Sequence, residues 1–566
     1  MARKVEALEV PAVVERVLSE GKFSVEKFVE SFGVLVEAAG GTKPLRQLVR
    51  RLATRGQLAT QQPGDEPVVS LLAAVEWRRA RLVQERKAST ADDQKKISPG
   101  EMPFTIPNGW HWVRFGVATI CRDGQRIPVS KEERSARLGH YPYYGASGII
   151  DTINGFIFDE PLLLVGEDGA NLVNRSTPIA FIATGKYWVN NHAHVLDGAN
   201  EDYLRYLALF INAIDLVPYV TGTAQPKMNQ AKMNSIPVPI PPLAEQKRIV
   251  ARVDQLMALI DQLEAKQNRK RDLGARFTQA SLEALTTAES PQDFTTAWTR
   301  IQSTWPTLLD HSEKMAQVRK AIVALALRGK LLPQAGSEGT AETLLQILGR
   351  HGLTVRRAEI EGLPSPPDSW AWVHLGSLVT FGPKNGYSPK AVERPTKVKS
   401  LTLSATTSGA FDGSFFKYID EDVPYDSDLW LSDGDILVQR GNTIDYVGVA
   451  AVFRGPKRTF IYPDLMMKIR VASELDLDFI HLALNGPMAR EFIVSRASGT
   501  SGTMPKINQG VLLDIPIPLP PALEQRRIAT RVQSLMKLCD ALEATLRRSE
   551  DRAAKLAEAV VQEMVA

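Results

Sequence analysis

Two stretches of the chain carry hydrophobic residues at alternating steps of four and three positions, which is the a/d spacing of a coiled-coil seam. Each stretch follows a pair of prolines, Pro241-Pro242 or Pro520-Pro521, whose rings keep the backbone extended before a helix begins. We therefore expect two long helices, each with one apolar stripe. The first stripe is Ile249, Val253, Leu256, Ile260 and Leu263, and the second is Ile528, Val532, Leu535, Cys539, Leu542 and Leu546.

The two expected helices belong to an internal duplication. Residues 226–265 align without gaps with residues 505–544, and 22 of the 40 aligned positions are identical. Two shorter matches, 45–58 with 318–331 and 107–116 with 367–376, occur at similar offsets. Each half therefore has the same order: a helix ending at Arg-Gly, a linker, a Trp-x-Trp segment, a long mixed segment, a proline-rich exit and a second helix.

This order divides the chain into five regions. We expect a helical region at 1–106, a mixed domain at 107–242, a central helical region at 243–365, a second mixed domain at 366–521 and a C-terminal helix at 522–566. Stretches such as LLLV, AFIAT and WVNNHAHVL support strands in the first mixed domain.

The predicted fold class is α+β, with two mixed domains separated by long antiparallel coiled-coil helices. Because the two halves are alike, antiparallel packing of these helices would create an approximate two-fold axis. Stripes of this kind also occur in homodimers and in purely structural bundles, so the stripes by themselves leave those alternatives open.

Composition narrows the class of protein. The 566 residues include 68 basic and 64 acidic side chains, and the resulting net charge of +4 is too small to indicate a nucleic-acid partner by itself. The only cysteines are Cys121 and Cys539, which predicts neither a disulfide framework nor a zinc cage and favours the cytoplasm. No uncharged apolar run approaches the 18 residues needed to span a bilayer.

A set of motifs runs in the same order through both halves. They are the helices LRQLVRRLATRGQL and VRKAIVALALRGKL, the segments IPNGWHWVRFG and LPSPPDSWAWVHLG, the interior segments YPYYGASGIID, LLLVGEDGAN and DGDILVQRGNT, and the exits PKMNQAKMNSIPVPIPPLAEQKRIV and PKINQGVLLDIPIPLPPALEQRRIA. In this order, the motifs resemble the specificity (S) subunit of type I restriction-modification systems over nearly the whole chain.

The resemblance implies a non-catalytic subunit with two target recognition domains, each reading one half of an asymmetric split DNA sequence. It also implies that the conserved helices set the gap and dock two modification subunits, with restriction subunits in the full complex. S-adenosylmethionine, ATP and Mg would then bind to those partners, and this chain would bind no cofactor or metal itself.

The sequence agrees with a non-catalytic role, because it contains no Asn-Pro-Pro-Tyr-type adenine methylation motif and no P-loop. A self-contained DNA-modifying or DNA-cleaving enzyme with duplicated recognition domains is the alternative. A scaffold that binds no DNA is a third possibility. His192 and His194 flank one residue and could share a strand face, but without a third ligand we expect packing rather than metal binding.

Candidate DNA-binding residues are the loop side chains able to donate and accept hydrogen bonds at base edges or phosphates. In the first mixed domain they are Tyr143, Tyr144, Ser147, Glu167, Asp168, Asn171, Asn190, Asn191, His192, Thr221, Thr223, Gln225, Lys227 and Asn229. In the second they are Lys384, Asn385, Tyr387, Gln439, Arg440, Asn442, Thr443, Ser498, Thr500, Ser501, Thr503, Lys506 and Asn508.

Shared and unshared residues predict different roles. The PKxNQ motif occurs in both halves, so we expect it to hold backbone or phosphate, whereas readers of different half-sites should differ. The better specificity candidates are therefore residues that differ between the domains: Glu167, Asp168 and Asn171 in the first, and Gln439, Arg440 and Asn442 in the second. The Trp-x-Trp segments at Trp110 and Trp370 are expected to fix each mixed domain on its helix.

The mixed domains are slightly acidic, which limits what they can do with DNA alone. Residues 101–242 contain 11 basic and 13 acidic residues, and residues 366–521 contain 15 and 17, so each has a net charge of −2. Because phosphate neutralisation supplies most DNA affinity, we expect partner subunits to contribute cations.

Overall fold

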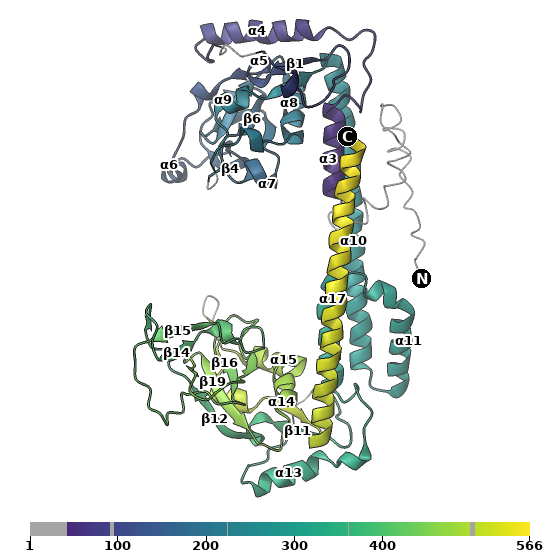
Figure 1. Cartoon of the computed structure of the whole chain (residues 1–566), viewed down its shortest axis with the longest axis vertical. Coiled ribbons are helices and arrows are strands. Elements are labelled where there is room, and N and C mark those ends of the chain that lie inside the picture. Colours follow the sequence, from purple (N-terminus) through teal and green to yellow (C-terminus); the bar gives the residue numbers. More distant parts are fainter. Residues whose placement is uncertain (1–41, 91–95, 223–224, 360–361, 499–503, 566) are drawn as a thin grey trace. The chain divides into compact units, whose positions relative to one another are not determined.

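Both long helices predicted from the apolar stripes are present. α10 spans Leu243–Thr287 and α17 spans Ala522–Val565 (Figure 1). Each begins just after its proline pair, and the side-chain amides of Gln246 and Gln525 donate back to the first proline carbonyl of that pair at 2.7 and 2.9 Å. These bonds fix the sharp change from extended backbone to helix.

The computed structural model describes residues 42–90, 96–222, 225–359, 362–498 and 504–565. The chain forms two compact units, one of residues 1–270 with 549–566 and the other of residues 271–548, and each is described by itself. The part of the predicted N-terminal helical region that covers residues 1–41 lies outside the described residues.

In the first unit, two helices precede the mixed domain: α3 (Thr42–Thr54) and α4 (Val68–Gln84). Leu45, Leu48 and Leu52 on one face of α3 share a core with α10. At the edge of this contact Arg46 pairs with Asp261 at 2.5 Å and with Glu264 at 2.8 Å. α4 buries Val68, Leu71, Val75 and Leu82 in the same core.

The first mixed domain has one two-stranded and two four-stranded sheets. The antiparallel pair is β1 (His111–Arg114) with β10 (Pro237–Ile240). One sheet has the order β2 (Ile120–Cys121), β9 (Ala193–Asp197), β6 (Leu162–Gly166), β7 (Ala180–Ala183), and the other β4 (Gly148–Ile153), β3 (Tyr141–Gly145), β8 (Lys186–Val189), β5 (Phe158–Asp159). Its helices are α5 (Phe115–Ala118), α6 (Lys131–Ala136), α7 (Asn171–Asn174), α8 (Glu201–Ala213) and α9 (Gln230–Asn234).

The second unit repeats the antiparallel pair and the strand order of one four-stranded sheet, and its other four-stranded sheet has a different order. Its antiparallel pair is β11 (Ala371–His374) with β20 (Pro516–Leu519). One sheet is β12 (Val379–Asn385), β19 (Met466–Val471), β16 (Ile436–Gln439), β17 (Ala450–Val452), and the other is β13 (Ala391–Val392), β15 (Phe416–Ile419), β14 (Val398–Leu401), β18 (Phe460–Ile461). The helices are α11 (Pro291–Leu308), α12 (Met315–Leu327), α13 (Ala341–Arg350), α14 (Leu477–Leu484), α15 (Pro487–Arg496) and α16 (Gln509–Leu513).

A buried tryptophan fixes each mixed domain to the start of its long helix, as the Trp-x-Trp segments predicted. Trp110 Nε1 donates to Glu245 Oε2 of α10 at 3.0 Å, and Trp370 Nε1 donates to Glu524 Oε2 of α17 at 3.0 Å. Both indole rings are almost fully buried. The same bond therefore forms at the same place in both repeats.

The Arg-Gly at the end of α3 makes a sharp turn against this tryptophan. Gln57 N donates to Leu52 O, and Gly56 N to Ala53 O, which is the hydrogen-bond pattern of a Schellman C-cap. Gly56 has φ +69°, and a Cβ there would lie 2.5 Å from Pro107 Cγ. Gly329 repeats the turn with φ +67°, and a Cβ would lie 2.4 Å from Pro367 Cγ. Only glycine fits this position.

The two apolar stripes are most deeply buried near the starts of their helices. Ile249, Val253, Leu256 and Ile260 lie in a core with α3 and with Ala557 and Val561 near the end of α17. Ile528 and Val532 lie in the core of the second unit, and Cys539 is buried as expected for a stripe position. The remaining stripe residues are partly buried: Leu263, Leu535, Leu542 and Leu546. Packing of one stripe on the other stays a prediction.

One predicted strand is two strands. WVNNHAHVL is divided into β8 and β9 by a turn at residues 190–192, so His192 is not on a strand and does not share a face with His194. The polar run Asn190-Asn191-His192 makes the turn because such side chains hydrogen-bond to nearby backbone. Across the described residues, the helices are too short or too polar to cross a membrane.

Candidate nucleic-acid interface

Three loops of the first mixed domain are hydrogen-bonded into one surface. They are residues 166–169 after β6, residues 190–192 between β8 and β9, and residues 221–222 and 225–229 before α9, and we call them the first interface loops. Glu167 N donates to His192 O, and Met228 N to Glu167 O, both at 2.8 Å. Lys227 forms isolated β-bridges with Thr221 and Asp168. Sequence reasoning selected these three loops separately, and the structure brings them together.

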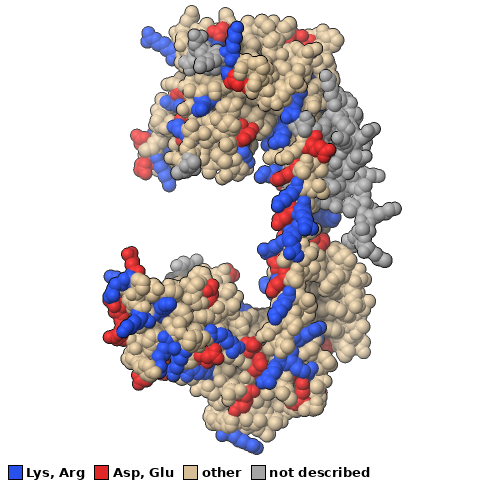
Figure 2. All heavy atoms as spheres, viewed as in Figure 1, with Lys and Arg blue, Asp and Glu red and all other residues tan. Residues whose placement is uncertain are grey.

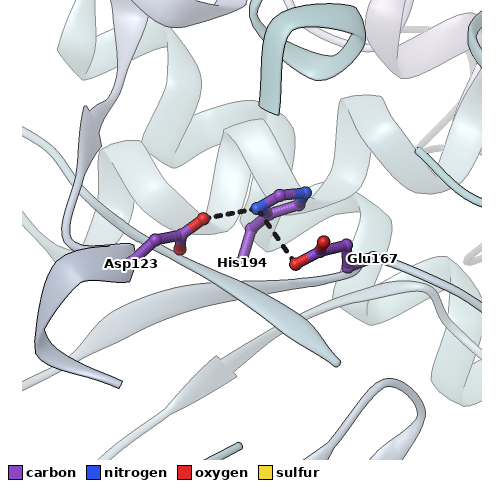
Figure 3. A group of neighbouring side chains, drawn as sticks. All are labelled: Asp123, Glu167 and His194. Carbon is purple, nitrogen blue, oxygen red and sulfur yellow. Dashed lines mark hydrogen bonds and ion pairs between the residues drawn. The ribbon is translucent and has the colours of Figure 1, made fainter. Parts of the chain in front are cut away.

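A buried ion-pair network lies under the first interface loops (Figure 3). His194 Nδ1 lies 2.6 Å from Asp123 Oδ2 and 3.9 Å from Glu167 Oε2, and its Nε2 lies 2.9 Å from the carbonyl of Met228. Burial lowers the pKa of His194, but the hydrogen bond and charge of Asp123 outweigh it and raise that pKa above its ordinary value. The ring therefore holds three segments of the domain together.

These three side chains have donor types that metals use, but their bonds fit an ion-pair network instead. A carbonyl only accepts, so Nε2 of His194 carries a hydrogen, and Nδ1 donates to a carboxylate. Arg126 and Lys227 also pair with Glu167, at 2.9 and 3.1 Å, which adds two cations to the cluster. A metal ion would need a free ring nitrogen and fewer cations.

Several predicted residues of the first domain are exposed on this surface. Ser147, Asn191, Thr221 and Gln225 face solvent, and so does Lys227, whose side chain is 52% exposed. His192 is half exposed and its Nδ1 lies 2.7 Å from Asp168 Oδ2. Asn229 caps α9 by accepting from Lys232 N at 2.9 Å, which gives it a structural role. Thr223 lies outside the described residues.

Other predicted residues of this domain are engaged inside it. Tyr143 is a correction: it is fully buried and its hydroxyl bonds to the backbone of Val129, so it cannot contact DNA. Asn190 is also a correction, since it is 5% exposed and its Oδ1 accepts from His192 N. Tyr144 is half-buried and stacks on Phe181 at 5.8 Å.

Glu167 and Asn171 were specificity candidates that the structure uses locally. Glu167 is 12% exposed and paired with Arg126 and Lys227. Asn171 bonds to Ser176 and to the backbone of Thr177, which orders the turn after α7. Asp168, the third predicted specificity residue in this domain, is partly buried and bonded to the half-exposed His192.

The second mixed domain joins its loops in the same way. Lys506 forms isolated β-bridges with Ser498 and Gly441, and Ile507 N donates to Arg440 O at 2.9 Å. Asn508 caps α16 by accepting from Val511 N at 2.8 Å, as Asn229 caps α9. We call residues 439–443, 498 and 504–508 the second interface loops. The shared Pro-Lys-x-Asn thus bridges protein backbone and caps a helix in both domains, and its contact with DNA backbone or phosphate stays a prediction.

Gln439 is a further correction, because it is fully buried. Its amide donates to Leu403 O at 3.1 Å and to the hydroxyls of Thr406 and Thr407 at 3.0 and 3.3 Å, and it accepts from Asn442 at 2.6 Å. It therefore orders the loop instead of reading a base. Thr500, Ser501 and Thr503 lie outside the described residues.

The other predicted residues of the second domain are partly or fully exposed. Arg440 is half-buried, and its guanidinium forms no hydrogen bond or ion pair with any residue that the structure describes. Thr443 and Lys506 are exposed. Three form surface contacts: Lys384 pairs with Asp428 at 2.6 Å, Tyr387 donates to Glu421 at 3.4 Å, and Asn385 accepts from Gln509 at 3.5 Å.

Charge over the mixed domains is interleaved. On the face shown in Figure 2, basic and acidic side chains alternate over both domains without one continuous basic surface. This agrees with the net charge of −2 that the sequence assigns to each of residues 101–242 and 366–521. The interface loops therefore suit directional hydrogen bonding to base edges better than strong electrostatic attraction to a duplex.

Sequence reasoning missed Asp123 and Arg126 altogether. Asp123 lies 71 residues from His194 in the chain, and Arg126 lies 41 residues from Glu167. Because these separations are long, no local spacing pattern in the sequence predicts the network. His194 was expected to be a packed side chain, and its 1% exposure confirms that.

The sequence of this chain matches a known family model and is similar to known proteins. A family model described as "Type I restriction modification DNA specificity domain" matches residues 108–270 and 367–549. The chain is 25% identical over 563 residues to the type I restriction enzyme EcoEI specificity subunit of Escherichia coli, which covers 92% of this chain and 93% of that one. It is 26% identical over 561 residues to the EcoAI specificity subunit of Escherichia coli, with the same shares covered.

A chain from a solved structure described as "Structural basis underlying complex assembly and conformational transition of the type I R-M system" also matches. Its TM-score is 0.40 at 17% identity, and the match covers 82% of this chain and 99% of that chain.

Proposed function

Since this chain belongs to the family of type I restriction-modification specificity subunits, we propose that it recognises an asymmetric two-part DNA target through its two mixed domains. A specificity subunit is the non-catalytic, DNA-recognising component of such a system. The observation that carries the proposal is the pair of interface loop sets, built alike in both domains and carrying different exposed side chains.

The two loop sets separate support from reading. Lys227 and Lys506 hold equivalent bridges, and Asn229 and Asn508 cap equivalent helices. The exposed residues around them differ, because the first set presents Asn191 and His192, and the second presents Arg440 and Thr443. Asn suits adenine and Arg suits guanine, so we expect the two half-sites to differ in sequence.

The long helices are proposed to set the gap between half-sites. α10 has 45 residues, which corresponds to about 68 Å at roughly 1.5 Å per residue and exceeds one turn of B-form DNA, about 34 Å. Ala557 and Val561 of α17 pack in one core with the first turns of α10, which supports an antiparallel arrangement of the two stripes.

The partners follow from the family and from charge. We propose that two modification subunits and, in the full complex, restriction subunits dock on this chain in the cytoplasm. S-adenosylmethionine, ATP and Mg would bind to those partners. Because the mixed domains are acidic overall, the modification subunits would also supply much of the phosphate-neutralising charge.

A domain exchange tests the proposal. The chain is coexpressed with its modification subunits, and methylated adenines are mapped in the host genome before and after residues 107–242 are replaced by the equivalent domain of a relative. We expect one half-site of the methylated sequence to change and the other half-site and the gap to stay. A change in both half-sites, or the absence of any two-part motif, would contradict the proposal.

A second measurement addresses the alternative of a self-contained enzyme. The purified chain is incubated with DNA, S-adenosylmethionine, ATP and Mg, with and without the modification subunits. We expect no methylation and no cleavage by the chain alone. Either reaction without partners would refute the non-catalytic assignment.

A further inference from the structure

A cleft of about 590 Å³ lies between α3 and the first mixed domain, outside the interface loops. Its wall carries five basic side chains, and only two acidic ones, Asp215 and Glu264. The basic residues are Lys43, Arg46, Arg50, Arg51 and Arg175. All of them belong to the first unit.

Most of this positive charge is not neutralised by the protein. Arg46 is neutralised, because it pairs with Asp261 and Glu264. Lys43, Arg50 and Arg51, by contrast, form no side-chain hydrogen bond or ion pair within the part of the chain that the structure describes. Asp215 is engaged in its own turn, where it accepts from Val217 N at 3.0 Å. The cleft therefore has spare hydrogen-bond donors and a net positive charge.

Arg175 is placed to complete a binding site. Its Nη2 donates to the carbonyls of Ile211 and Ile214 at 2.8 and 2.6 Å, which fixes the guanidinium in the wall. Its Nη1 is buried and has no hydrogen-bond partner. Burial and then the nearby charge of Arg50 lower the pKa of Arg175, although the charge of Asp215 partly opposes them, so Arg50 lies close enough to repel the Arg175 guanidinium.

The second repeat supplies an internal comparison. Residues 45–58 align with 318–331, and Arg319 of α12 repeats the pairing of Arg46 through Asp540 and Glu543, both at 2.6 Å. At the positions of Arg50 and Arg51, however, the second repeat has Val323 and Ala324. The alignment therefore retains the structural ion pair and lacks the two unpaired arginines.

The cleft beside α12 also differs in charge. It measures about 500 Å³, and its wall includes Lys320 and Arg328 together with Glu283 and Glu491. Two basic and two acidic side chains leave it without net charge. The positive cleft is thus a property of the first repeat and not of the architecture that the repeats share.

We propose that the cleft beside α3 binds a backbone phosphate of DNA next to the half-site read by the first mixed domain, an inference that rests on the proposed function. Guanidinium groups bind phosphate through paired, charge-assisted hydrogen bonds. The chain also connects the two places directly: α7 leads from the first interface loop at residues 166–169 to Arg175 in the cleft wall. A duplex held by that loop would therefore continue toward the cleft.

The salt dependence of binding tests the proposal. The chain in complex with its modification subunits is titrated with the duplex that carries its methylated sequence, at several salt concentrations. Arg50→Gln should reduce the slope of log K against log salt by about 0.9 and weaken binding about eightfold at 0.1 M salt. Arg50→Lys should keep the slope. An unchanged slope in Arg50→Gln would overturn the proposal.

Lys320→Gln is the matched control, because Lys320 lines the uncharged cleft of the second repeat and aligns with Gln47 in the first. We expect it to leave the slope unchanged. A loss equal to that of Arg50→Gln would mean that general charge is responsible and would also overturn the proposal. Thermal unfolding of both variants checks that they are folded.

Neutral methylphosphonate linkages identify the phosphate. The phosphates of the duplex are replaced by these linkages one at a time. Replacement at one position should weaken DNA binding by the wild-type complex without further weakening DNA binding by the Arg50→Gln complex. That position should lie beside the half-site that changes when residues 107–242 are exchanged. A position beside the other half-site, or no such position, would refute the inference.

Three outcomes distinguish a failure of the proposed function, a failure of the cleft inference, and a site for free phosphate. If the wild-type complex shows no sequence preference, the proposed function fails. If it binds specifically and Arg50→Gln behaves like wild type, only the cleft inference fails. Inorganic phosphate, at constant ionic strength, should not raise the unfolding temperature of the free wild-type chain above that of Arg50→Gln. If it does, the cleft is a site for a free anion and the DNA assignment is wrong.

Discussion

Replacing Gly56 with alanine tests how each mixed domain is joined to its helix. Gly56 has φ +69°, and its Cβ would lie 2.5 Å from Pro107 Cγ and 3.0 Å from Trp110 Cζ2. A left-handed backbone costs a non-glycine residue about 1 to 2 kcal/mol, and inserting a methyl group into a packed contact costs about 1 to 3 kcal/mol. We expect Gly56→Ala to lower the free energy of unfolding of the first unit by about 3 kcal/mol.

Differential scanning calorimetry of the full chain measures this effect. At about 2 to 4 °C per kcal/mol for a unit of this size, the transition of the first unit should fall by roughly 6 to 12 °C. Gly64→Ala is the matched control, since a Cβ at Gly64 would meet nothing within 4 Å. Gly329→Ala should lower the transition of the second unit instead. Equal behaviour of Gly56→Ala and Gly64→Ala would show that the turn against Pro107 is not tightly packed.

Three other perturbations follow from contacts described above. Trp110→Phe and Trp370→Phe each leave a buried carboxylate oxygen without its indole donor, so each should lower the free energy of unfolding of its own unit by about 1 to 3 kcal/mol. Calorimetry can separate the transitions of the two units. A shift of both transitions by either variant would count against local anchoring. Burial lowers the pKa of His194 but Asp123 raises it overall, so protonation of His194 stabilises the first unit at pH values below the ordinary pKa of about 6.5, and this stability is lost as pH rises through the raised pKa. The unfolding temperature of the first unit should therefore fall as pH increases above about 6.5. His194→Gln should remove this pH dependence, and a dependence that persists in the variant would mean that another group causes it. Arg319→Gln breaks ion pairs with the largely exposed Asp540 and with Glu543, so it should cost less than about 1 kcal/mol, and a larger loss in thermal unfolding would mean that the pair is more than a surface contact.

The elements with a local signal were predictable. The four-three spacing and the proline pairs predicted α10 and α17, and each helix begins at the residue after its proline pair. The duplication predicted two domains of one kind, and the two-stranded pair and one four-stranded sheet have the same strand order in both domains, whereas the other four-stranded sheet differs. Trp110 and Trp370 were identified because the same residue type recurs at the same place in both halves.

The side-chain environment within the loops was not predictable. In YPYYG, the neighbouring tyrosines differ in burial: Tyr143 is fully buried and Tyr144 is half-buried. No alternation of polar and apolar residues in this segment predicts the difference. Gln439 is a polar residue in a loop motif, and its partners Thr406 and Thr407 are more than 30 residues away. Its burial depends on contacts that only the folded chain creates.

The pairing of β1 with β10 has an evolutionary consequence. His111 lies opposite Ile240 and Arg114 opposite Pro237, so the chain enters and leaves the first mixed domain through adjacent antiparallel strands. β11 and β20 repeat this with Ala371 opposite Leu519. A foreign module whose ends form the same short ribbon could replace either domain by recombination without disturbing the helices, and under the proposed function such an exchange would change one half-site in a single genetic event.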